Sequence, residues 1–412
     1  MATAPKKTNE ITTELTTGIT NELTTEITKY EFLCGTDIGN SKTEISYRVG
    51  EEIVSVRQPS VITRLLRKPP TSDLSESTLV EDLLNNLSVQ INSPALRTDG
   101  TFFVGKKAFS NSKNLKDMNI VLGNKVDQDV PIINTLSMIA AINVKKYYQE
   151  KKSLPSQLMV DVSKSTAIPS SEFTASVAKR LEDRLLGTHL VALYIGEKTV
   201  MVAINIVKCK VTEEGKTSML AFKNSSNEIL RHYNATYQLN STPKDFKNKK
   251  SLHIDIGDGT SEFTAMFGYN PIPDSSHGER LGVGHATNEA ITLYREELKG
   301  VGKISRQSFM ELLQEDTEKA EFAREKLEEA TILQSEAILE ATQEAFVSLT
   351  ESSSDFFFVH GGGSIVFKDD LYDLLVTFAN SIKARVVWIP EEFATHLQSK
   401  GNLYLAEALF KK

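Results

Sequence analysis

Three short segments, far apart in the chain, share one pattern that suits phosphate binding. In each, an apolar, strand-like run leads into a turn rich in glycine: Phe32–Leu33 into Asp37–Thr43, Leu252–Ile254 into Asp255–Thr260, and Phe356–Val359 into His360–Ser364. Glycine has no side chain, so the backbone N–H groups of such a turn can approach a phosphate. The carboxylates of Asp37 and Asp255 would repel a bare phosphate, but they suit a hydrated Mg²⁺ that bridges the phosphates. Together the segments predict a site for a nucleotide with Mg²⁺.

Each segment taken alone has another interpretation, an ordinary β-hairpin turn, because Asp-x-Gly is common by chance. Their order along the chain favours the shared site. It resembles the actin-like ATPase superfamily, which has a phosphate-1 hairpin near the start, a phosphate-2 hairpin after the middle, and a glycine cluster, the adenosine motif, near the C-terminus. The resemblance implies an α/β, actin-like (ribonuclease H-like) fold of two lobes with the nucleotide in the cleft between them.

Composition narrows the class of protein. The chain has 412 residues, 40% hydrophobic and 25% charged, with a formal net charge of -7. This acidic balance gives no overall basic field for nucleic acid. The two cysteines, Cys34 and Cys209, form no disulfide framework and fit a reducing cytoplasm. Neither they nor the histidines show metal-ligand spacing, and no apolar run is long enough to span a bilayer. We expect a cytoplasmic protein without direct DNA binding and without a membrane association.

The remaining sequence predicts the organisation of the chain. Residues 1–30 contain an imperfect repeat rich in Thr and Glu, with too few apolar residues to fix a fold. We interpret it as a flexible extension, or else as a segment that orders on a partner. Alternating strand and helix patterns follow, which is typical of α/β architecture. We predict a first lobe over 31–248, completed by 391–412 with a terminal helix at Gly401–Phe410, and a second lobe over 249–390.

One stretch indicates a branch of the superfamily. From Leu158 the chain runs through a strand, a helix and Leu185–His189, then short strands and the loop Lys210–Gly215. This resembles the bacterial plasmid-segregating ParM-type actins, in which the corresponding loop carries the catalytic acid. The resemblance implies that Glu214 polarises the attacking water. A surface hairpin carboxylate is the alternative for Glu214, and Glu213, which stands where the family has proline, and Glu228 are the reserves.

The resemblance also implies roles for the turn residues. Asp37 and Asp255 would hold Mg²⁺ and its waters, and Asp255 would join Glu214 in catalysis. Lys42 would add a charge to the phosphates, unless it is a solvent-facing strand lysine. Asp258 resembles the corresponding turn residue of actin. The full set of expected nucleotide contacts is Asp37, Gly39, Asn40, Ser41, Lys42, Gly257, Asp258, Gly259, Thr260, Gly282, Gly284, Gly361, Gly362, Gly363 and Ser364.

The expected function follows from this family. A bacterial, plasmid-encoded protein would bind ATP or GTP with Mg²⁺, polymerise into helical filaments, and reach plasmid DNA through a separate DNA-binding adaptor. The first alternative is a sugar or acetate kinase of the same fold. A second is an FtsA- or MreB-like cytoskeletal scaffold, although no basic amphipathic end suggests a membrane tether. A chaperone ATPase is disfavoured because no peptide-binding domain follows the third turn.

Overall fold

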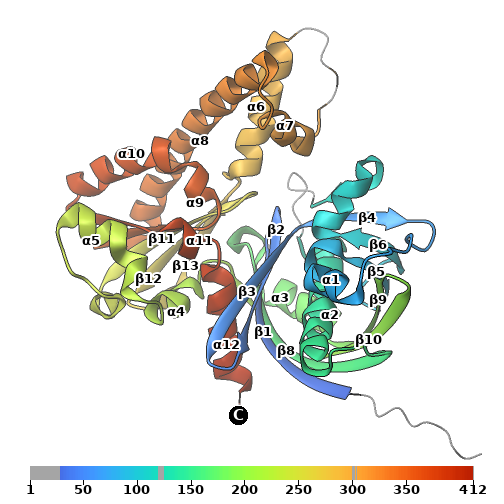
Figure 1. The fold of residues 1–412 in the computed structure, drawn as a ribbon. Helices are drawn as coiled ribbons and strands as arrows, with labels where there is room; N and C mark the ends of the chain where they lie inside the picture. The colour runs from blue at the N-terminus through green and yellow to red at the C-terminus, as the bar shows by residue number, and fades with distance from the viewer. Residues whose placement is uncertain (1–27, 119–124, 299–301, 303, 412) are drawn as a thin grey trace, which may run out of the picture.

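Two β-sheets organise the chain into two lobes (Figure 1). The computed structural model describes residues 28–118, 125–298, 302 and 304–411. Within them, ten strands form the first sheet in the order β3-β2-β1-β8-β10-β9-β5-β6-β4-β7. Their bounds are β1 Thr28–Ile38, β2 Lys42–Val49, β3 Glu52–Pro59, β4 Val61–Leu65, β5 Ser88–Asn92, β6 Gly100–Val104, β7 Leu115–Asp117, β8 Gln157–Ile168, β9 Gly187–Ile195 and β10 Lys198–Glu213.

Helices cover the first sheet. The longest of them, α2, is almost wholly buried over its first four turns and carries a proline near its start, where the missing N–H costs no hydrogen bond. The helical segments of this lobe are α1 Glu76–Glu81, η1 Leu83–Asn86, η2 Gly105–Asn114, η3 Lys125–Asp127, α2 Val130–Lys151, η4 Ser170–Glu172 and α3 Ala175–Leu185. Phe32, Val160 and Val202 of the central strands share one large core with α2 and α3.

The second sheet has five strands among the described residues, in the order β13-β12-β11-β14-β15. Its interior strand β14 is buried along its whole length, as expected of a strand covered on both faces. Phe357 and Val359 face one core, while Phe356 and Phe358 face another, because successive side chains of a strand alternate. The bounds are β11 Lys250–Ile256, β12 Ser261–Phe267, β13 Asn270–Glu279, β14 Phe356–His360 and β15 Arg385–Trp388.

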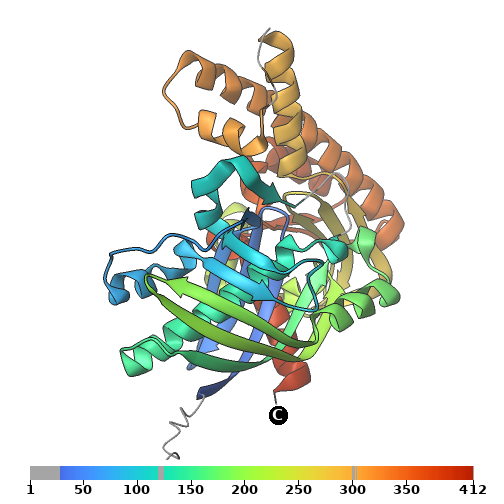
Figure 2. The same cartoon turned by 90° about the vertical axis from the view of Figure 1, so that its right-hand side faces the viewer.

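Two groups of helices sandwich the second sheet. One face carries the long helix α8 with α10, and α6 and α7 extend the lobe upward along α8 (Figures 1 and 2). The other face carries α4 and α5. The bounds are α4 Ser218–Lys223, η5 Asn227–Leu230, α5 Arg231–Tyr237, η6 Pro243–Phe246, α6 Val283–Glu297, α7 Arg306–Leu312, α8 Glu318–Thr350, α9 Gly363–Val366, α10 Lys368–Ser381, α11 Glu391–Ala394 and α12 Leu397–Phe410.

The C-terminal helix α12 lies between the lobes (Figure 1). It packs against β1 so closely that a Cβ at Gly35 would lie 2.0 Å from the backbone nitrogen of Leu403. On its other side it contacts α4. The predicted terminal helix is therefore present, and it starts four residues earlier than the sequence indicated, at Leu397.

Some contacts bear on the predicted lobe boundaries, which remain predictions. Most of the proposed extension lies outside the described residues, but Thr28–Tyr30 belong to β1, paired with β8. The sequence predicts that the segment 218–246 belongs to the first lobe. In the structure, Phe222 packs against Phe358 and Tyr233 packs against Phe356, both on β14 of the second sheet. Apolar burial on that sheet favours a boundary close to the end of β10.

Both cysteines flank one buried lysine in the first sheet. Cys34 on β1 and Cys209 on β10 are each registered with Lys164 on β8, the strand between them. An intervening strand keeps the thiols apart, and both cysteines are free. Lys164 has no exposed surface, and its Nζ has no hydrogen-bond partner among the described residues. Burial lowers the pKa of the Lys164 amine, against a smaller opposing effect of the two cysteines.

Replacing this lysine by methionine should stabilise the protein. The charged amine is disfavoured in the folded state, so the unfolded chain binds more protons below the ordinary lysine pKa of about 10.4. We expect Lys164→Met to gain about 1–4 kcal/mol at neutral pH, the range seen when buried ionic groups are replaced by apolar residues of similar volume. Urea unfolding measures it. The gain should shrink as the pH rises toward 10, and a less stable variant would contradict the prediction.

Candidate functional site

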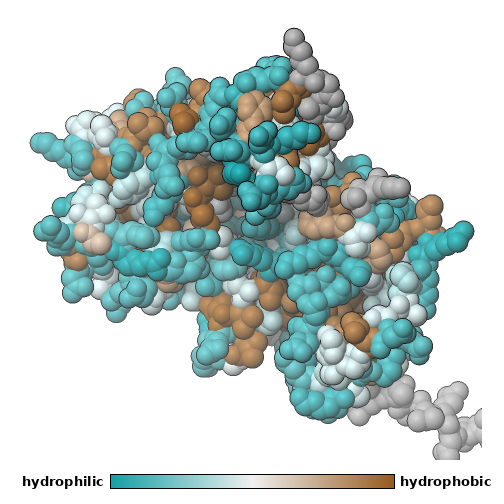
Figure 3. All heavy atoms as spheres, turned by 45° about the horizontal axis from the view of Figure 1, so that its top comes forward, coloured by the Kyte–Doolittle hydropathy of each residue, from teal (hydrophilic) through white to brown (hydrophobic). Residues whose placement is uncertain are grey.

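The three glycine turns meet in one pocket between the lobes, where the surface is hollowed (Figure 3). The first turn joins β1 to β2, the second joins β11 to β12, and the third follows β14. Parallel pairing of β11 with β14 brings Asp255 beside His360 and so puts the last two turns at one sheet edge. The pocket is lined by Asp37, Gly39, Asn40, Lys125, Glu214, Asp255, Gly257, Asp258, Gly259, Thr260, His360, Gly361, Gly362, Ala394, Thr395 and Gln398.

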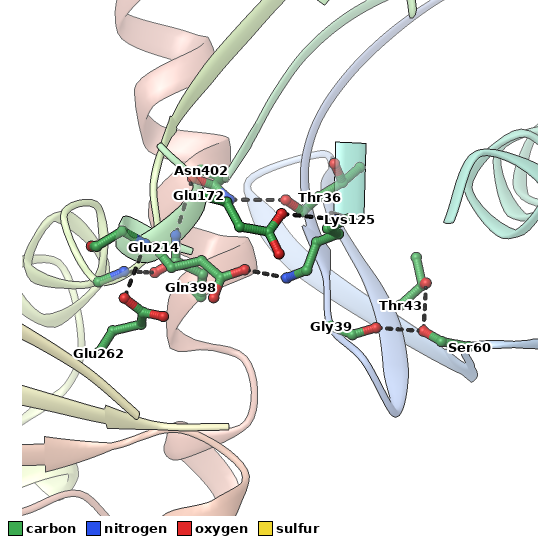
Figure 4. Close-up of polar contacts among 12 residues, drawn as sticks. Thr36, Gly39, Thr43, Ser60, Lys125, Glu172, Glu214, Glu262, Gln398 and Asn402 are labelled. Atoms are coloured by element: carbon green, nitrogen blue, oxygen red, sulfur yellow. Dashed lines mark hydrogen bonds and ion pairs between the residues drawn. The ribbon is translucent and has the colours of Figure 1, made fainter. Parts of the chain in front are cut away.

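The first turn is braced by Ser60, which lies between β3 and β4. Ser60 donates its hydroxyl to the carbonyl of Gly39 at 2.7 Å (Figure 4). Its backbone N–H donates to the carbonyl of Ser41 at 2.8 Å. Thr43 lies 3.0 Å from the same hydroxyl. These bonds use the carbonyl oxygens of the turn and fix its shape. Gly39 and Asn40 of the braced turn line the pocket.

The second turn is closed by its own backbone and backed by α6. The N–H of Gly257 donates to the carbonyl of Thr260 at 2.8 Å, and the N–H of Gly284 donates to the carbonyl of Asp258 at 2.8 Å. A Cβ at Gly282 would lie 2.4 Å from the Asp258 carbonyl oxygen, so only glycine permits this approach. Gly282 and Gly284 thus support the turn from behind and do not line the pocket.

The third turn, after β14, allows a close approach to β11 in the second lobe. Gly361 has φ +87°, and a Cβ there would lie 2.3 Å from Asp255 Oδ1. Glycine satisfies both constraints. Beside it, the buried His360 places Nδ1 3.5 Å from the same Asp255 oxygen. Ser364 donates its hydroxyl to the Gly361 carbonyl at 2.8 Å and holds the turn.

A lysine and a glutamate form an ion pair at the pocket wall. Lys125 Nζ contacts Glu214 Oε1, and both side chains are largely buried, with 5% and 13% of their surface exposed. Glu172 accepts the backbone N–H of Lys125 at 2.8 Å (Figure 4). The N–H of Glu214 donates to the Ile168 carbonyl at 2.8 Å. Glu214 is therefore held at its backbone and at its carboxylate.

Burial and mutual repulsion shift the pKa values of these groups. Burial raises the pKa of the Glu214 carboxyl, although the Lys125 charge opposes this. The pKa of Asp37 is raised well above its usual range by burial, and further by the charges of Glu214 and Glu44. Burial alone would lower the pKa of Lys125, but Glu214 and Asp37 raise it above the usual value. The pocket carries excess negative charge that a bound cation would offset.

Helix α12 supports the part of the pocket wall that contains Glu214. Gln398 accepts the N–H of Gly215 at 3.1 Å and donates to the Thr217 hydroxyl at 2.9 Å. One turn later, Asn402 donates to the carbonyl of Thr36 at 2.8 Å. The helix thus connects the strand before the first turn with the loop after Glu214 (Figure 4).

The donor set fits a magnesium ion held jointly with phosphates. Asp37 from one lobe and Asp255 from the other line the same pocket. In the described part of the chain, no cluster of three or more His, Cys, Asp or Glu side chains could hold a metal on its own. Magnesium is usually bound through one or two carboxylates, its waters and the substrate's phosphates, which are the ligands a nucleotide would complete here.

Most, but not all, of the expected contacts line this pocket. Those that do are Asp37, Gly39, Asn40, Glu214, Asp255, Gly257, Asp258, Gly259, Thr260, Gly361 and Gly362. The expected contacts outside the lining are Ser41, Lys42, Gly282, Gly284, Gly363 and Ser364. Lys42 is exposed at the start of β2, as its alternative interpretation has it. Of the reserves, Glu213 pairs with Lys216, and Glu228 is exposed on η5.

Several lining residues were not predicted. Lys125 belongs to none of the three turn motifs, so the motifs gave no sign of its role. Gln398 lies on the face of α12 that meets the Glu214 loop, and only the packing of that helix identifies it. His360 stands at the start of the third turn, where its chemistry could have suggested a role beside Asp255.

Comparison with known proteins identifies the fold. Bacillus thuringiensis ParM with ATP has a TM-score of 0.59 at 17% identity, covering 92% of this chain and 99% of that one. The actin-like protein Alp7A gives 0.63 at 17% identity, with 93% and 96% covered. The archaeal actin homologue Ta0583 gives 0.59 at 15% identity, with 92% and 99% covered. The chain has the actin-like, ParM-type fold, and the α/β two-lobed prediction is confirmed.

Two further comparisons add no function. No protein-family model matches the sequence, and the search of curated proteins finds no match. None of the helices in the described residues is long and apolar enough to cross a membrane.

Proposed function

We propose that this chain is a Mg²⁺-dependent NTPase that assembles into filaments and segregates plasmid DNA in the bacterial cytoplasm. One observation carries the proposal: three glycine turns from two lobes meet in a pocket that also holds two aspartates and a lysine–glutamate pair. The fold supports it, since the structures of similar fold include Bacillus thuringiensis ParM with ATP, with ADP and with AMPPNP.

The pocket residues account for hydrolysis of a γ-phosphate. That reaction needs neutralisation of charge and a positioned water, and little covalent chemistry from the protein. Amides of the first two turns would hold the β- and γ-phosphates. The Lys125 ammonium group would face the negative charge of the γ-phosphate as it is hydrolysed. Glu214 would orient the water and accept its proton. Bound Mg²⁺ would neutralise the phosphates, with Asp37 and Asp255 fixing its position.

Assembly would follow from two conformations of the lobes. A nucleotide that binds the closed conformation more tightly shifts the population toward it, and hydrolysis removes that difference. The phosphate turns belong to different lobes, so a triphosphate that contacts both favours closure. Closed subunits would polymerise, and subunits left with diphosphate would dissociate.

Light scattering combined with electron microscopy tests the proposal. Adding Mg²⁺ with ATP, or with GTP, to purified protein should raise the scattering and give filaments that later disassemble as phosphate is released. The matched control is the same nucleotide in EDTA. Absence of polymer at micromolar protein would contradict the proposal. Phosphorylation of sugars or acetate without polymer would point to the kinase alternative.

Coupling to DNA would require a separate adaptor. The net charge of -7 disfavours direct neutralisation of DNA phosphates at physiological salt. An adaptor bound to its DNA site should therefore attach to the filament. Tight, salt-resistant binding of duplex DNA by the purified chain alone would contradict this part of the proposal.

An ion pair across the pocket mouth should slow nucleotide exchange. Arg306 at the start of α7 lies 3.1 Å from Asp258 in the second turn and 3.4 Å from Asp117 on β7 of the first lobe. Arg306→Gln removes this link between the lobes. Such a half-exposed pair is worth up to about 1 kcal/mol, so we expect dissociation of a fluorescent nucleotide to accelerate by up to about fivefold.

The salt dependence of nucleotide release and a second variant test whether the Arg306 ion pair is the cause. Asp117→Asn, which removes only the first-lobe partner, should accelerate release in the same direction. High salt should narrow the difference from the wild type because the pair is partly exposed. Unchanged release in both variants at low salt would show that the pair does not hold the mouth closed.

A further inference from the structure

A buried glutamate that the proposed chemistry leaves unused lies beside the pocket. Glu262 on β12 is 2% exposed and is registered with Asp255 on the neighbouring strand. Gly278 lies opposite Glu262 on β13, the other neighbouring strand. A Cβ at Gly278 would lie 2.5 Å from Glu262 Oε2. The carboxyl group thus occupies space that exists because residue 278 lacks a side chain.

This carboxyl group makes a contact between the two lobes. Its Oε2 accepts the backbone N–H of Ser170 at 2.9 Å. Ser170 begins η4, in the loop that follows β8 of the first sheet, whereas Glu262 belongs to the second sheet. This hydrogen bond connects the loop of one lobe to the sheet of the other (Figure 4).

The same loop holds Glu214. Two residues before Ser170, the Ile168 carbonyl accepts the Glu214 N–H at 2.8 Å. Two residues after it, Glu172 accepts the N–H of Lys125 at 2.8 Å, and Lys125 pairs with the Glu214 carboxylate. Any displacement of this loop would move both the backbone and the ion-pair partner of Glu214.

We propose that Glu262 is a positioning residue that ties the Ile168–Glu172 loop to the second lobe and thereby fixes Glu214 over the phosphate site. This inference rests on the proposed NTPase function. It makes the position of the catalytic carboxylate depend on how the lobes meet. Closure of the lobes around a triphosphate would then also set the geometry for hydrolysis.

The protonation of Glu262 suits this role. Burial, and next the charge of Glu214, raise its pKa to about 8. The raised pKa favours the uncharged acid, which can lie beside Glu214 without repelling it. Glutamine is an uncharged side chain of the same size whose carbonyl oxygen can also accept the Ser170 N–H.

Steady-state kinetics of two variants at Glu262 test the inference. Glu262→Ala removes the acceptor, and we expect kcat to fall between about 10-fold and 10²-fold, the cost of a misplaced reacting group. The KM for ATP should change by less than about threefold, since the turns that bind the nucleotide are intact. Glu262→Gln should restore kcat to near the wild-type value. Thermal melting checks that both variants fold.

Ser170→Pro offers an independent test of the same hydrogen bond. Pro169 has ψ 143°, a conformation that a following proline favours, and position 170 starts a helix, where proline is tolerated. The substitution removes the N–H donor with little other change. It should lower kcat as Glu262→Ala does, and the double variant should be no slower than either single variant, because both remove one interaction.

The outcomes separate this inference from the proposed function. If the wild type does not hydrolyse NTP, the proposed function is wrong and the inference with it. If the wild type is active, wild-type kcat in both Glu262→Ala and Ser170→Pro overturns the inference alone. A Glu262→Gln variant as slow as Glu262→Ala also overturns it, because the acidic proton would then matter more than the contact with Ser170.

Discussion

An Asp255→Ala variant is expected to lose Mg²⁺-dependent nucleotide binding and every behaviour that follows from it. Asp255 is the second-to-last residue of β11, lines the pocket and faces His360 at 3.5 Å. Alanine removes one of the two carboxylates that we assign to the metal. We expect the affinity for ATP with Mg²⁺ to fall by at least the roughly 10–100-fold that loss of a supporting group costs a metal site.

Calorimetric titration with ATP, in Mg²⁺ and in EDTA, measures this loss. Chelation should weaken binding by the wild type but should weaken the variant little further, because the variant no longer holds the metal. Asp183→Ala is the matched control: it removes an exposed aspartate on α3 that pairs with Lys179, far from any turn. Tight Mg²⁺-dependent binding by Asp255→Ala would refute the assignment of Asp255.

The glycine turns were predictable because their signals are local. An apolar strand, a glycine and an aspartate within a few residues describe the whole turn at Asp37 and again at Asp255. Strand pairing then brings Asp255 to His360 and Gly361, and this step also follows from the pattern, since buried parallel strands end at a common edge. The structure accordingly puts these turns in one pocket.

The residues that the sequence did not reveal act over long separations. Lys125 meets Glu214 across 89 positions, and Ser170 meets Glu262 across 92. Neither contact leaves a periodic or compositional trace, since each depends on how a loop of one lobe lies against another element. Lys42, whose position beside a phosphate turn suggested a phosphate contact, is exposed and lies outside the pocket lining.

Substituting Glu214 by glutamine should slow hydrolysis without weakening nucleotide binding. Glutamine keeps the size of the side chain, and its carbonyl oxygen can still accept a hydrogen bond from Lys125. What it loses is the ability to take a proton from water. Removal of a positioned acid–base group costs about 10²–10⁴-fold in rate, and we expect turnover to fall by at least the lower figure.

The filaments formed by this variant should outlast those of the wild type. Binding would still close the lobes, so scattering should rise as usual on adding Mg²⁺ with ATP, but its decay should follow the slowed release of phosphate. Single-turnover phosphate release and the scattering decay, measured on one sample, test both effects. A control is Glu213→Gln, which changes the adjacent carboxylate that pairs with Lys216.

Near-normal turnover in Glu214→Gln would show that Glu214 is not the general base. The structure limits which other carboxylates could take that role. Glu213 and Glu228 were the reserves, yet neither lines the pocket. Glu262 is buried, and it is not among the residues that line the pocket, so it is poorly placed to take a proton from the attacking water. Water would then have to be activated by the phosphate itself, and the loop that holds Glu214 would matter only for closing the lobes.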